Sequence, residues 1–313
     1  MTGLLEGRVC VVTGAGNGLG REHAFLLAAE GARVVVNDVG VSVAGVGSDL
    51  TPAKETVRMI RDAGGEAIVN GDSVADWEGA GRIVQQAIDE FGGLDVLVNN
   101  AGVVYHRDLV DMKEDEFERV MGVHLRGHFA TMRAAAQYWR DRHEAGQPVS
   151  GSIVNTASGA ILGTPGLNDY GAAKAGIATA TLALAVELEQ YGVRVNCIAP
   201  IARSRLARAQ TAPLLAPPDD PAVFDRWHPG NVSPLVAYLA TETCPFTGGV
   251  FHTVANEIGL YGGWSLEEEA ILRSDRRWTV AALQEAAPRL LEGRRPVASQ
   301  MLTIEETFPS REE

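Results

Sequence analysis

Three side chains between residues 158 and 174 have the types and the spacing for acid–base chemistry on an oxygen atom. They are the hydroxyl of Ser158, the phenol of Tyr170 and the ammonium group of Lys174. Because Tyr170 and Lys174 are four positions apart, they share one face of a helix. A free phenol has a pKa of ~10, and a fixed ammonium group beside it favours the phenolate and lowers that pKa. Tyr170 is therefore a candidate general acid or base near neutral pH.

Ser158 follows a strand-like run, GSIVNT at 151–156, at the entrance to the loop that leads to Tyr170. A hydroxyl at that place can donate a hydrogen bond to a substrate oxygen on which negative charge develops. A tyrosine and a lysine four positions apart are common by chance. The assignment of these three residues to catalysis therefore needs support from other motifs in the chain.

The elements that would position these residues alternate along the chain. Near-continuous apolar strands alternating with helices predict a parallel sheet with helices on both faces. The expected fold class is therefore α/β, a Rossmann-type doubly wound parallel sheet of about seven strands, with ligands bound beyond the carboxyl ends of the strands. The predicted strands are 8–13, 33–37, 66–70, 94–98, 151–156, 193–199 and 249–254. The predicted helices lie near 19–30, 52–63, 75–91, 114–143, 169–190 and 233–242.

A glycine-rich loop, TGAGNGLG at 13–20, follows the first strand and opens the first helix. Glycines there let backbone amides approach a pyrophosphate, and the positive end of the helix dipole favours its negative charge. A strand before, a helix after and an acid at the end of the second strand are the context of a dinucleotide site. The loop residues expected to contact the dinucleotide are Gly14, Asn17, Gly18, Leu19 and Gly20.

The acid is Asp38, eighteen positions after Gly20. Its carboxylate can accept both hydroxyls of the adenosine ribose and would repel a 2′-phosphate. Neither Asn17 nor Val39 supplies the positive charge that a phosphorylated ribose would need. We therefore predict NAD rather than NADP as the cofactor; the alternative for Asp38 is a solvated turn acid. The positive charge of an oxidised nicotinamide would lower the pKa of Tyr170 further.

Two further strand ends carry candidate cofactor contacts. Asn100, Ala101 and Gly102 follow the fourth strand, where small residues let a flat ligand come close to the backbone. Asp72 and Ser73 follow the third strand and could meet the edge of an adenine. A simple turn explains this second pair nearly as well.

The combined motifs resemble those of the short-chain dehydrogenase/reductase family over roughly residues 5 to 260. The motifs are Thr13-Gly14-x-x-x-Gly18-x-Gly20, Asn99-Asn100-Ala101-Gly102, Ser158 and Tyr170-x-x-x-Lys174. More narrowly, VVVNDVG at 34–40 and the extended loop after it are similar to the (3R)-hydroxyacyl-CoA dehydrogenase unit of multifunctional enzyme type 2 and to related bacterial dehydrogenases. The resemblance implies hydride transfer between a secondary alcohol and NAD, with Ser158, Tyr170 and Lys174 as catalytic residues. Tyr170 and Lys174 would also contact the cofactor.

The loop between serine and tyrosine departs from the family pattern. The family usually places its serine thirteen positions before the tyrosine, whereas Ser158 and Tyr170 are twelve apart. An ungapped comparison therefore puts Ala157 at the serine position. We predict instead a one-residue deletion within GAILG at 159–163, which keeps Ser158 at the strand end.

The family's fourth catalytic residue, an asparagine, is here His124, which type 2 hydroxyacyl-CoA enzymes share. His124 is a candidate for a proton relay from Lys174 through water or, alternatively, a packed helix residue. The resemblance also implies contacts to the nicotinamide carboxamide after the sixth strand, from the backbone of Pro200, Ile201 and Ala202.

The composition of the chain indicates which partners and which compartment to expect. The chain of 313 residues has a formal net charge of −13, which argues against nucleic acids and anionic membranes as partners. We expect no membrane insertion, no signal peptide and no metal site. Cys10 and Cys197 lie in apolar strand-like runs and are expected to be buried thiols, which favours the cytoplasm.

Residues 1–263 are expected to form one NAD-binding domain, and residues 264–313 a C-terminal extension packed on it or on a neighbouring subunit. The resemblance implies contacts between subunits through the helices near 114–143 and 169–190. We therefore predict a homo-oligomer, a tetramer rather than a dimer.

The substrate is predicted only by class. Arg203, Arg205 and Arg208 could receive the phosphates of coenzyme A, or form an ordinary solvated helix face. The leading hypothesis is an NAD-dependent dehydrogenase for a 3-hydroxyacyl-CoA-like or other lipid-derived alcohol. The alternatives are a hydroxysteroid or general carbonyl reductase and, in another class, a weakly active NAD-binding scaffold.

Overall fold

The computed structural model describes residues 3–42, 47–203, 215–263 and 271–291. The chain divides into two compact units, Met1–Tyr261 and Gly262–Glu313. The described part of the second unit contains helix α9 (Val280–Ala286) and a short 3₁₀ turn. The first unit carries the sheet and every candidate site residue.

Eight strands form one sheet, in which the first seven are parallel and the last is antiparallel. Their order across the sheet is β3-β2-β1-β4-β5-β6-β7-β8. Because β1 pairs with both β2 and β4, the winding reverses there and the loops after β1 and β4 meet at one edge. All seven predicted strands are confirmed. The strands are β1 (Val9–Thr13), β2 (Arg33–Asn37), β3 (Glu66–Asn70), β4 (Val96–Asn99), β5 (Gly151–Thr156), β6 (Val193–Ile201), β7 (Val250–Val254) and β8 (Glu257–Leu260).

The eighth strand was not predicted. It pairs with β7 in a tight hairpin, Val254 lying opposite Glu257. Such a turn requires positive φ angles, which glycine and asparagine adopt most readily. Here Ala255 takes that conformation at φ 51°, the one such non-glycine residue in the described part of the chain. All four residues of β8 are exposed, so it is not one of the buried, continuous apolar runs by which the other strands were predicted.

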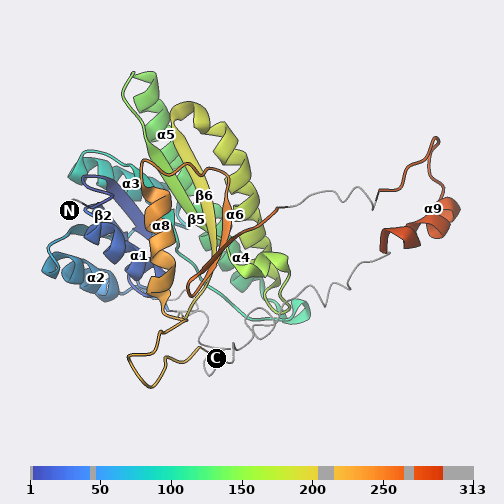
Figure 1. Cartoon of the computed structure of the whole chain (residues 1–313), viewed down its shortest axis with the longest axis horizontal. Coiled ribbons are helices and arrows are strands. Elements are labelled where there is room, and N and C mark those ends of the chain that lie inside the picture. The colour runs from blue at the N-terminus through green and yellow to red at the C-terminus, as the bar shows by residue number, and fades with distance from the viewer. Residues whose placement is uncertain (1–2, 43–46, 204–214, 264–270, 292–313) are drawn as a thin grey trace. The chain divides into compact units, whose positions relative to one another are not determined.

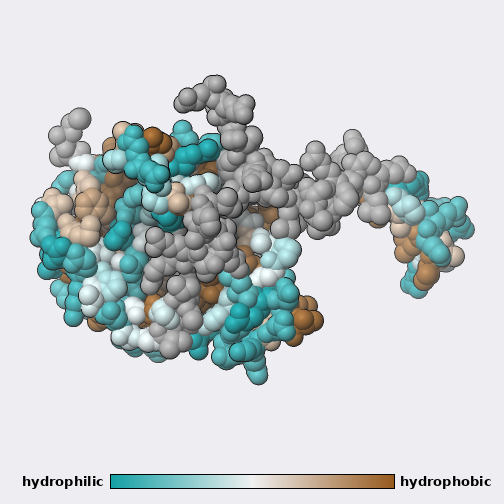
Figure 2. Space-filling view, turned by 90° about the horizontal axis from the view of Figure 1, so that it is seen from below, coloured by the Kyte–Doolittle hydropathy of each residue, from teal (hydrophilic) through white to brown (hydrophobic). Residues whose placement is uncertain are grey.

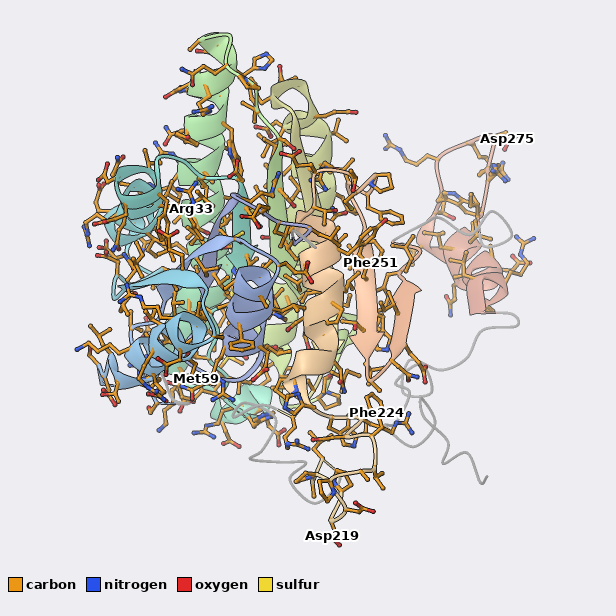
Figure 3. The ribbon with its side chains drawn as sticks, turned by 60° about the vertical axis from the view of Figure 1, so that its left-hand side comes forward. Arg33, Met59, Asp219, Phe224, Phe251 and Asp275 are labelled. Atoms are coloured by element: carbon orange, nitrogen blue, oxygen red, sulfur yellow. The ribbon has the colours of Figure 1, made fainter. Side chains whose placement is uncertain are left out.

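Helices cover both faces of the sheet (Figure 1). One face packs against α1 (Gly18–Ala29), α2 (Thr51–Asp62) and α8 (Ser233–Ala240) through a core that includes Phe251 of β7, which lies beside α8 (Figure 3). The other face packs against α3 (Trp77–Phe91), α5 (Gly127–Glu144) and α6 (Asn168–Glu187). The central strands are buried throughout, which explains their continuous valine and isoleucine runs.

The helix predicted near 114–143 is interrupted. It consists of α4 (Glu114–Met121), one π-helical turn over Gly122–Arg126 and then α5. A π-turn inserts an extra residue into a helix and is frequent at functional sites. Here it contains His124. Short 3₁₀ turns lie at Leu109–Asp111, Gly159–Leu162, Glu189–Tyr191 and Pro229–Val232.

A buried polar network fixes the carboxyl ends of β4 and β5 against the helices behind them. Asn99 Nδ2 donates to Asn155 Oδ1 at 3.1 Å, and Asn155 Nδ2 donates to Thr181 Oγ1 of α6 at 3.0 Å. Thr131 of α5 donates to Asn99 Oδ1 at 2.7 Å. Satisfied buried networks of this kind hold one arrangement of their elements. The loop that starts after β5 therefore begins from a fixed point.

Hydrophobic side chains on the face shown in Figure 2 form separate groups among hydrophilic residues. Among the described helices, none combines the length and the apolar character that crossing a lipid bilayer requires. The three cysteines are buried and free.

His23 of α1 makes stability depend on pH. Its Nδ1 lies 2.8 Å from Ser233 Oγ of α8, and its Nε2 is buried without a partner. Burial lowers its pKa from 6.5 to about 3. The unfolded chain therefore binds a proton that the folded chain does not, and stability is lost as the pH falls from 6.5 towards 3, by ~1.4 kcal/mol per pH unit.

We expect His23→Gln to make the free energy of unfolding, measured with urea, fall less steeply over that pH interval. The control is His143→Gln at an exposed position of α5. Equal slopes in the wild type and His23→Gln would contradict the assignment.

Candidate active site

Ser158 and Tyr170 meet at the carboxyl end of β5. Ser158 lies two residues beyond that strand and begins the 3₁₀ turn, accepting a hydrogen bond from the Ala160 amide at 3.2 Å. Its side chain also acts on the phenol of Tyr170, which lies in the first turn of α6, and lowers the pKa of that phenol. Ala157 instead is buried in a core cluster with Ile177 and Cys197. The structure therefore brings Ser158, and not Ala157, to the phenol.

Lys174 is almost completely buried on the same helix. Its Nζ donates to the backbone carbonyl of Thr156 and lies 5.5 Å from the centre of the Tyr170 ring. Burial lowers the pKa of Lys174 to about 7, while the Cys197 thiol acts in the opposite direction. Lys174 can therefore change its charge near neutral pH.

The pKa of Tyr170 behaves differently from the expectation. Burial raises it above 10, and the side chain of Ser158 lowers it by less. The sequence predicted a lower value from the Lys174 ammonium and a bound cofactor together. In the chain itself loss of solvent outweighs the effect of Ser158, and the lower pKa expected with a bound cofactor stays a prediction.

His124 lies against the phenol ring. Its ring meets that of Tyr170 edge to face, with 5.1 Å between the centres. Its Nε2 lies 2.7 Å from the carbonyl oxygen and 3.2 Å from the amide nitrogen of Val103, and the shorter contact, to an oxygen that only accepts, favours the proton on Nε2. Its Nδ1 is buried without a partner. Burial and then the charge of Lys174 hold the pKa of His124 well below 6.5, so the ring is neutral.

The glycine loop packs against the Asn-Ala-Gly turn. The Thr13 hydroxyl accepts from the amides of Asn100 and Ala101 at 3.0 and 3.1 Å. A Cβ atom on Gly14, whose φ is 65°, would lie 2.7 Å from the Ala101 Cα, and a Cβ atom on Gly20 would lie 2.3 Å from the Gly14 oxygen. Only glycine fits these two positions.

The amino-terminal end of α1 fits a phosphate group. Asn17 precedes the helix but makes no side-chain cap, and the first turn, with Gly18, Leu19 and Gly20, carries no acidic residue. The first amides of a helix have no partner within the helix, so an anion can bind them. The residues present therefore fit the pyrophosphate of a dinucleotide.

Asp38 lies beside this loop at the end of β2. Its Oδ2 accepts from the Gly16 amide at 2.8 Å and its Oδ1 from the Gly40 amide at 2.7 Å. Each oxygen keeps lone pairs for a further donor. Asp38 is buried, and is therefore not the solvated turn acid of the alternative reading.

The side chains of Asp72 and Ser73 form an ion pair and hydrogen bonds in and around the turn between β3 and α3. Asp72 pairs with Arg82 at 2.7 Å and accepts from Asn70 at 3.1 Å, and the Ser73 hydroxyl accepts from the Ala75 amide at 3.2 Å. A simple turn accounts for these contacts. Contact of the pair with an adenine stays a prediction.

The segment after β6 differs from the expectation in two ways. The strand continues through Pro200 to Ile201, which pairs with Val254, and Ala202 is buried. Arg203 forms a two-contact ion pair with Asp225 and donates to the Leu215 carbonyl at 3.0 Å. Its guanidinium therefore binds groups of the chain itself, and Arg203 is no longer a candidate for the predicted phosphate site.

Arg205 and Arg208, the other members of that predicted cluster, lie outside the described residues. Phe224, labelled in Figure 3, lies in the segment before α8 and is more than half exposed. Across the described ranges, no three His, Cys, Asp or Glu side chains are grouped as metal ligands would be.

Comparisons with known proteins agree on one family. A family model described as short chain dehydrogenase matches residues 8–207. The solved structure of a short chain dehydrogenase from Mycobacterium avium is 47% identical, with a TM-score of 0.83 over 94% of this chain and 98% of that chain.

Two curated proteins are similar as well. The hydroxyacyl-CoA dehydrogenase ChsB1 of Mycobacterium tuberculosis is 41% identical over 78% of this chain and 76% of its own length. Peroxisomal multifunctional enzyme type 2 of Mus musculus is 38% identical over 81% of this chain but only 32% of its own length. The chain thus corresponds to about a third of the mouse protein.

Proposed function

The chain belongs to the short-chain dehydrogenase/reductase family and is an oxidoreductase, and from this premise we propose that it interconverts a 3-hydroxyacyl thioester and its ketone with NAD. The observation that carries the proposal is the placement of Lys174 Nζ 5.5 Å from the Tyr170 ring on the same face of α6, with Ser158 acting on the same phenol from the end of β5. These groups suit proton exchange with one substrate oxygen.

In the oxidation direction Tyr170, as the phenolate that the Lys174 ammonium and an oxidised nicotinamide would favour, takes the proton of the substrate hydroxyl. Ser158 donates a hydrogen bond to the same oxygen, which carries negative charge at the transition state. Lys174, held by the Thr156 carbonyl, carries a positive charge beside the phenol below its pKa of about 7 and loses that charge above it. When bound, the nicotinamide supplies the acceptor for the hydride. His124, with its unpartnered Nδ1, is the proposed next group for the proton.

The family implies a nicotinamide dinucleotide, and Asp38 supports NAD over NADP. A 2′-phosphate about 5 Å from the carboxylate would cost roughly 3 kcal/mol at an effective dielectric constant of about 20. We expect Asp38→Asn to raise the ratio of kcat/KM with NADP to that with NAD on the order of a hundredfold. The asparagine keeps an acceptor for one backbone amide, so the loop is retained.

Asp49→Asn is the control for that substitution, because its exposed carboxylate lies in the same connecting segment between β2 and α2. An unchanged ratio in Asp38→Asn would remove the basis for NAD preference.

The substrate class is supported by the relatives, one of which is named a hydroxyacyl-CoA dehydrogenase. The test is NADH formation with both stereoisomers of a 3-hydroxyacyl-CoA, a hydroxysteroid and a simple secondary alcohol. We expect one 3-hydroxyacyl-CoA stereoisomer to have the highest kcat/KM. A higher value for the steroid would assign the hydroxysteroid alternative, and bound NAD without turnover would assign the scaffold.

The remaining proposals concern assembly. We propose a homotetramer in the cytoplasm, with residues 264–313 packed on the domain or on a neighbouring subunit. Phe129 of α5 and Leu182 and Val186 of α6 are apolar and exposed on the two helices that the family resemblance implicates. Sedimentation velocity measures the state directly, and a monomer would contradict it.

A further inference from the structure

Arg107 connects the loop after the Asn-Ala-Gly turn to helix α4. Its Nη2 lies 2.9 Å from Oε1 of Glu116, and its Nη1 donates to the His106 carbonyl at the same distance. The Glu116 side chain is 9% exposed, whereas that of Arg107 is 40% exposed. The pair is therefore partly withdrawn from water, and salt screens it less than a surface pair.

The backbone of the same residue connects this loop to the start of α6. The Arg107 amide donates to the Gly166 carbonyl at 3.0 Å, and Arg107 forms a parallel bridge with Leu167. Leu167 precedes α6 and accepts from the Gly171 amide at 2.7 Å, closing the turn that contains Tyr170. One residue thus joins α4, the loop and the turn of the phenol.

A second observation places the loop against α6. The pKa of His106 is lowered by burial and by the charge of Arg107, and is raised by the Asp169 carboxylate. Asp169 is the residue before Tyr170. The loop therefore lies close enough to the first turn of α6 for its charges to act there.

The carboxylate of Glu116 depends on Arg107 for its donor. Its Oε1 accepts from Arg107, while its Oε2 is buried and has no hydrogen-bond partner among the described residues. Separating the two side chains would leave a largely buried carboxylate without any donor, which is strongly unfavourable. The pair therefore favours the one arrangement in which α4 and the loop stay together.

We propose that Arg107 and Glu116 are positioning residues that hold the phenol of Tyr170 in its place for proton transfer. The proposal rests on the proposed function, in which Tyr170 is the acid–base residue. The ion pair sets the distance between α4 and the loop, and the loop sets the start of α6 through Gly166 and Leu167. Loosening the pair displaces the phenol relative to the substrate oxygen.

The first test is Glu116→Gln, which removes the charge and keeps the size. We expect kcat with a 3-hydroxyacyl-CoA to fall about tenfold to a hundredfold, because small misplacements of a catalytic group cost that much. The Kd of NAD, measured by protein fluorescence, is expected to change by less than about twofold. A merely structural role would lower the melting temperature and leave kcat of the folded protein unchanged.

A second readout needs no turnover. Hydrogen exchange of the Gly171 amide reports the opening of the turn that contains Tyr170, since that amide is bonded to Leu167. We expect it to be at least about tenfold faster in Glu116→Gln. The matched control is Glu55→Gln, which removes an ion pair of 2.6 Å with Arg58 that lies within α2 alone. The double variant Arg107→Met/Glu116→Met removes both charges and covers the case in which a single variant folds poorly.

The outcomes separate the two proposals. Absence of NADH formation by the wild type would refute the proposed function, while the exchange of the Gly171 amide would still test the positioning role of Arg107 and Glu116. Unchanged exchange and unchanged kcat in Glu116→Gln and in the double variant would overturn that positioning role alone. A loss of NAD affinity as large as the loss of kcat would also overturn it, because the effect would then act through the cofactor.

Discussion

Tyr170→Phe is expected to lower kcat/KM for alcohol oxidation on the order of 10²- to 10⁴-fold. The substitution removes only the phenolic oxygen, which is the atom that exchanges the proton. The ring remains, so its edge-to-face contact with His124 is kept. The Kd of NAD is expected to stay within about twofold of the wild type, because the glycine loop and Asp38 are untouched.

The control for this variant is Tyr138→Phe on α5, whose hydroxyl accepts from Arg142 at 3.3 Å away from the site. Steady-state rates and protein fluorescence measure the two effects. Turnover by Tyr170→Phe at the wild-type rate would remove Tyr170 from the mechanism.

Ser158→Ala is expected to lower kcat about a hundredfold to a thousandfold, as for loss of one donor to a charged transition-state oxygen. KM is expected to change much less, because the neutral substrate oxygen needs the donor less than the charged one does. This prediction also decides the alignment question, since Ala157 is the residue that an ungapped comparison places at the serine position.

Ser274→Ala is a closely matched control outside the predicted site. Both hydroxyls accept from the amide two residues further on, and both bonds are 3.2 Å long. Local destabilisation of the turn is therefore common to the two variants. If Ser158→Ala and Ser274→Ala had the same kcat, the role of Ser158 would be to stabilise a turn and not to take part in catalysis.

Much of the sheet could be predicted because its strands are buried on both faces and carry continuous runs of valine and isoleucine. The missed β8 had neither signal. Its turn uses Ala255 at a positive φ, and its side chains are all exposed. The π-turn around His124 was missed because one extra residue in a helix hardly changes the pattern of apolar positions.

The part of the candidate site that belongs to short sequence motifs could be predicted. Ser158, Tyr170 and Lys174 lie on adjoining elements, so their meeting follows from the chain order. Contacts between segments that are far apart in the sequence cannot be predicted from motifs or from the order of the elements. The ion pair of Arg203 with Asp225 joins residues that are 22 positions apart, and the acceptor of Lys174 is a backbone carbonyl, which residue type does not reveal.

The pKa of Tyr170 shows a further limit. Spacing indicates that a lysine is near, but the raised value follows from burial, which depends on all the elements packed around the phenol. The family resemblance is confirmed by the match over residues 8–207 and by the solved relative. The choice of NAD and of a thioester substrate goes further than those comparisons and depends on the tests above.

The central claim is that Tyr170 exchanges a proton with the substrate oxygen while hydrogen moves from the adjoining carbon to the cofactor. It is tested most directly in a single turnover with a 3-hydroxyacyl-CoA deuterated at that carbon. The account predicts that the deuterium is recovered in the dinucleotide by mass spectrometry, and that Tyr170→Phe slows this transfer as much as it lowers kcat. Deuterium found in solvent, or transfer at the wild-type rate without the phenol, would contradict it.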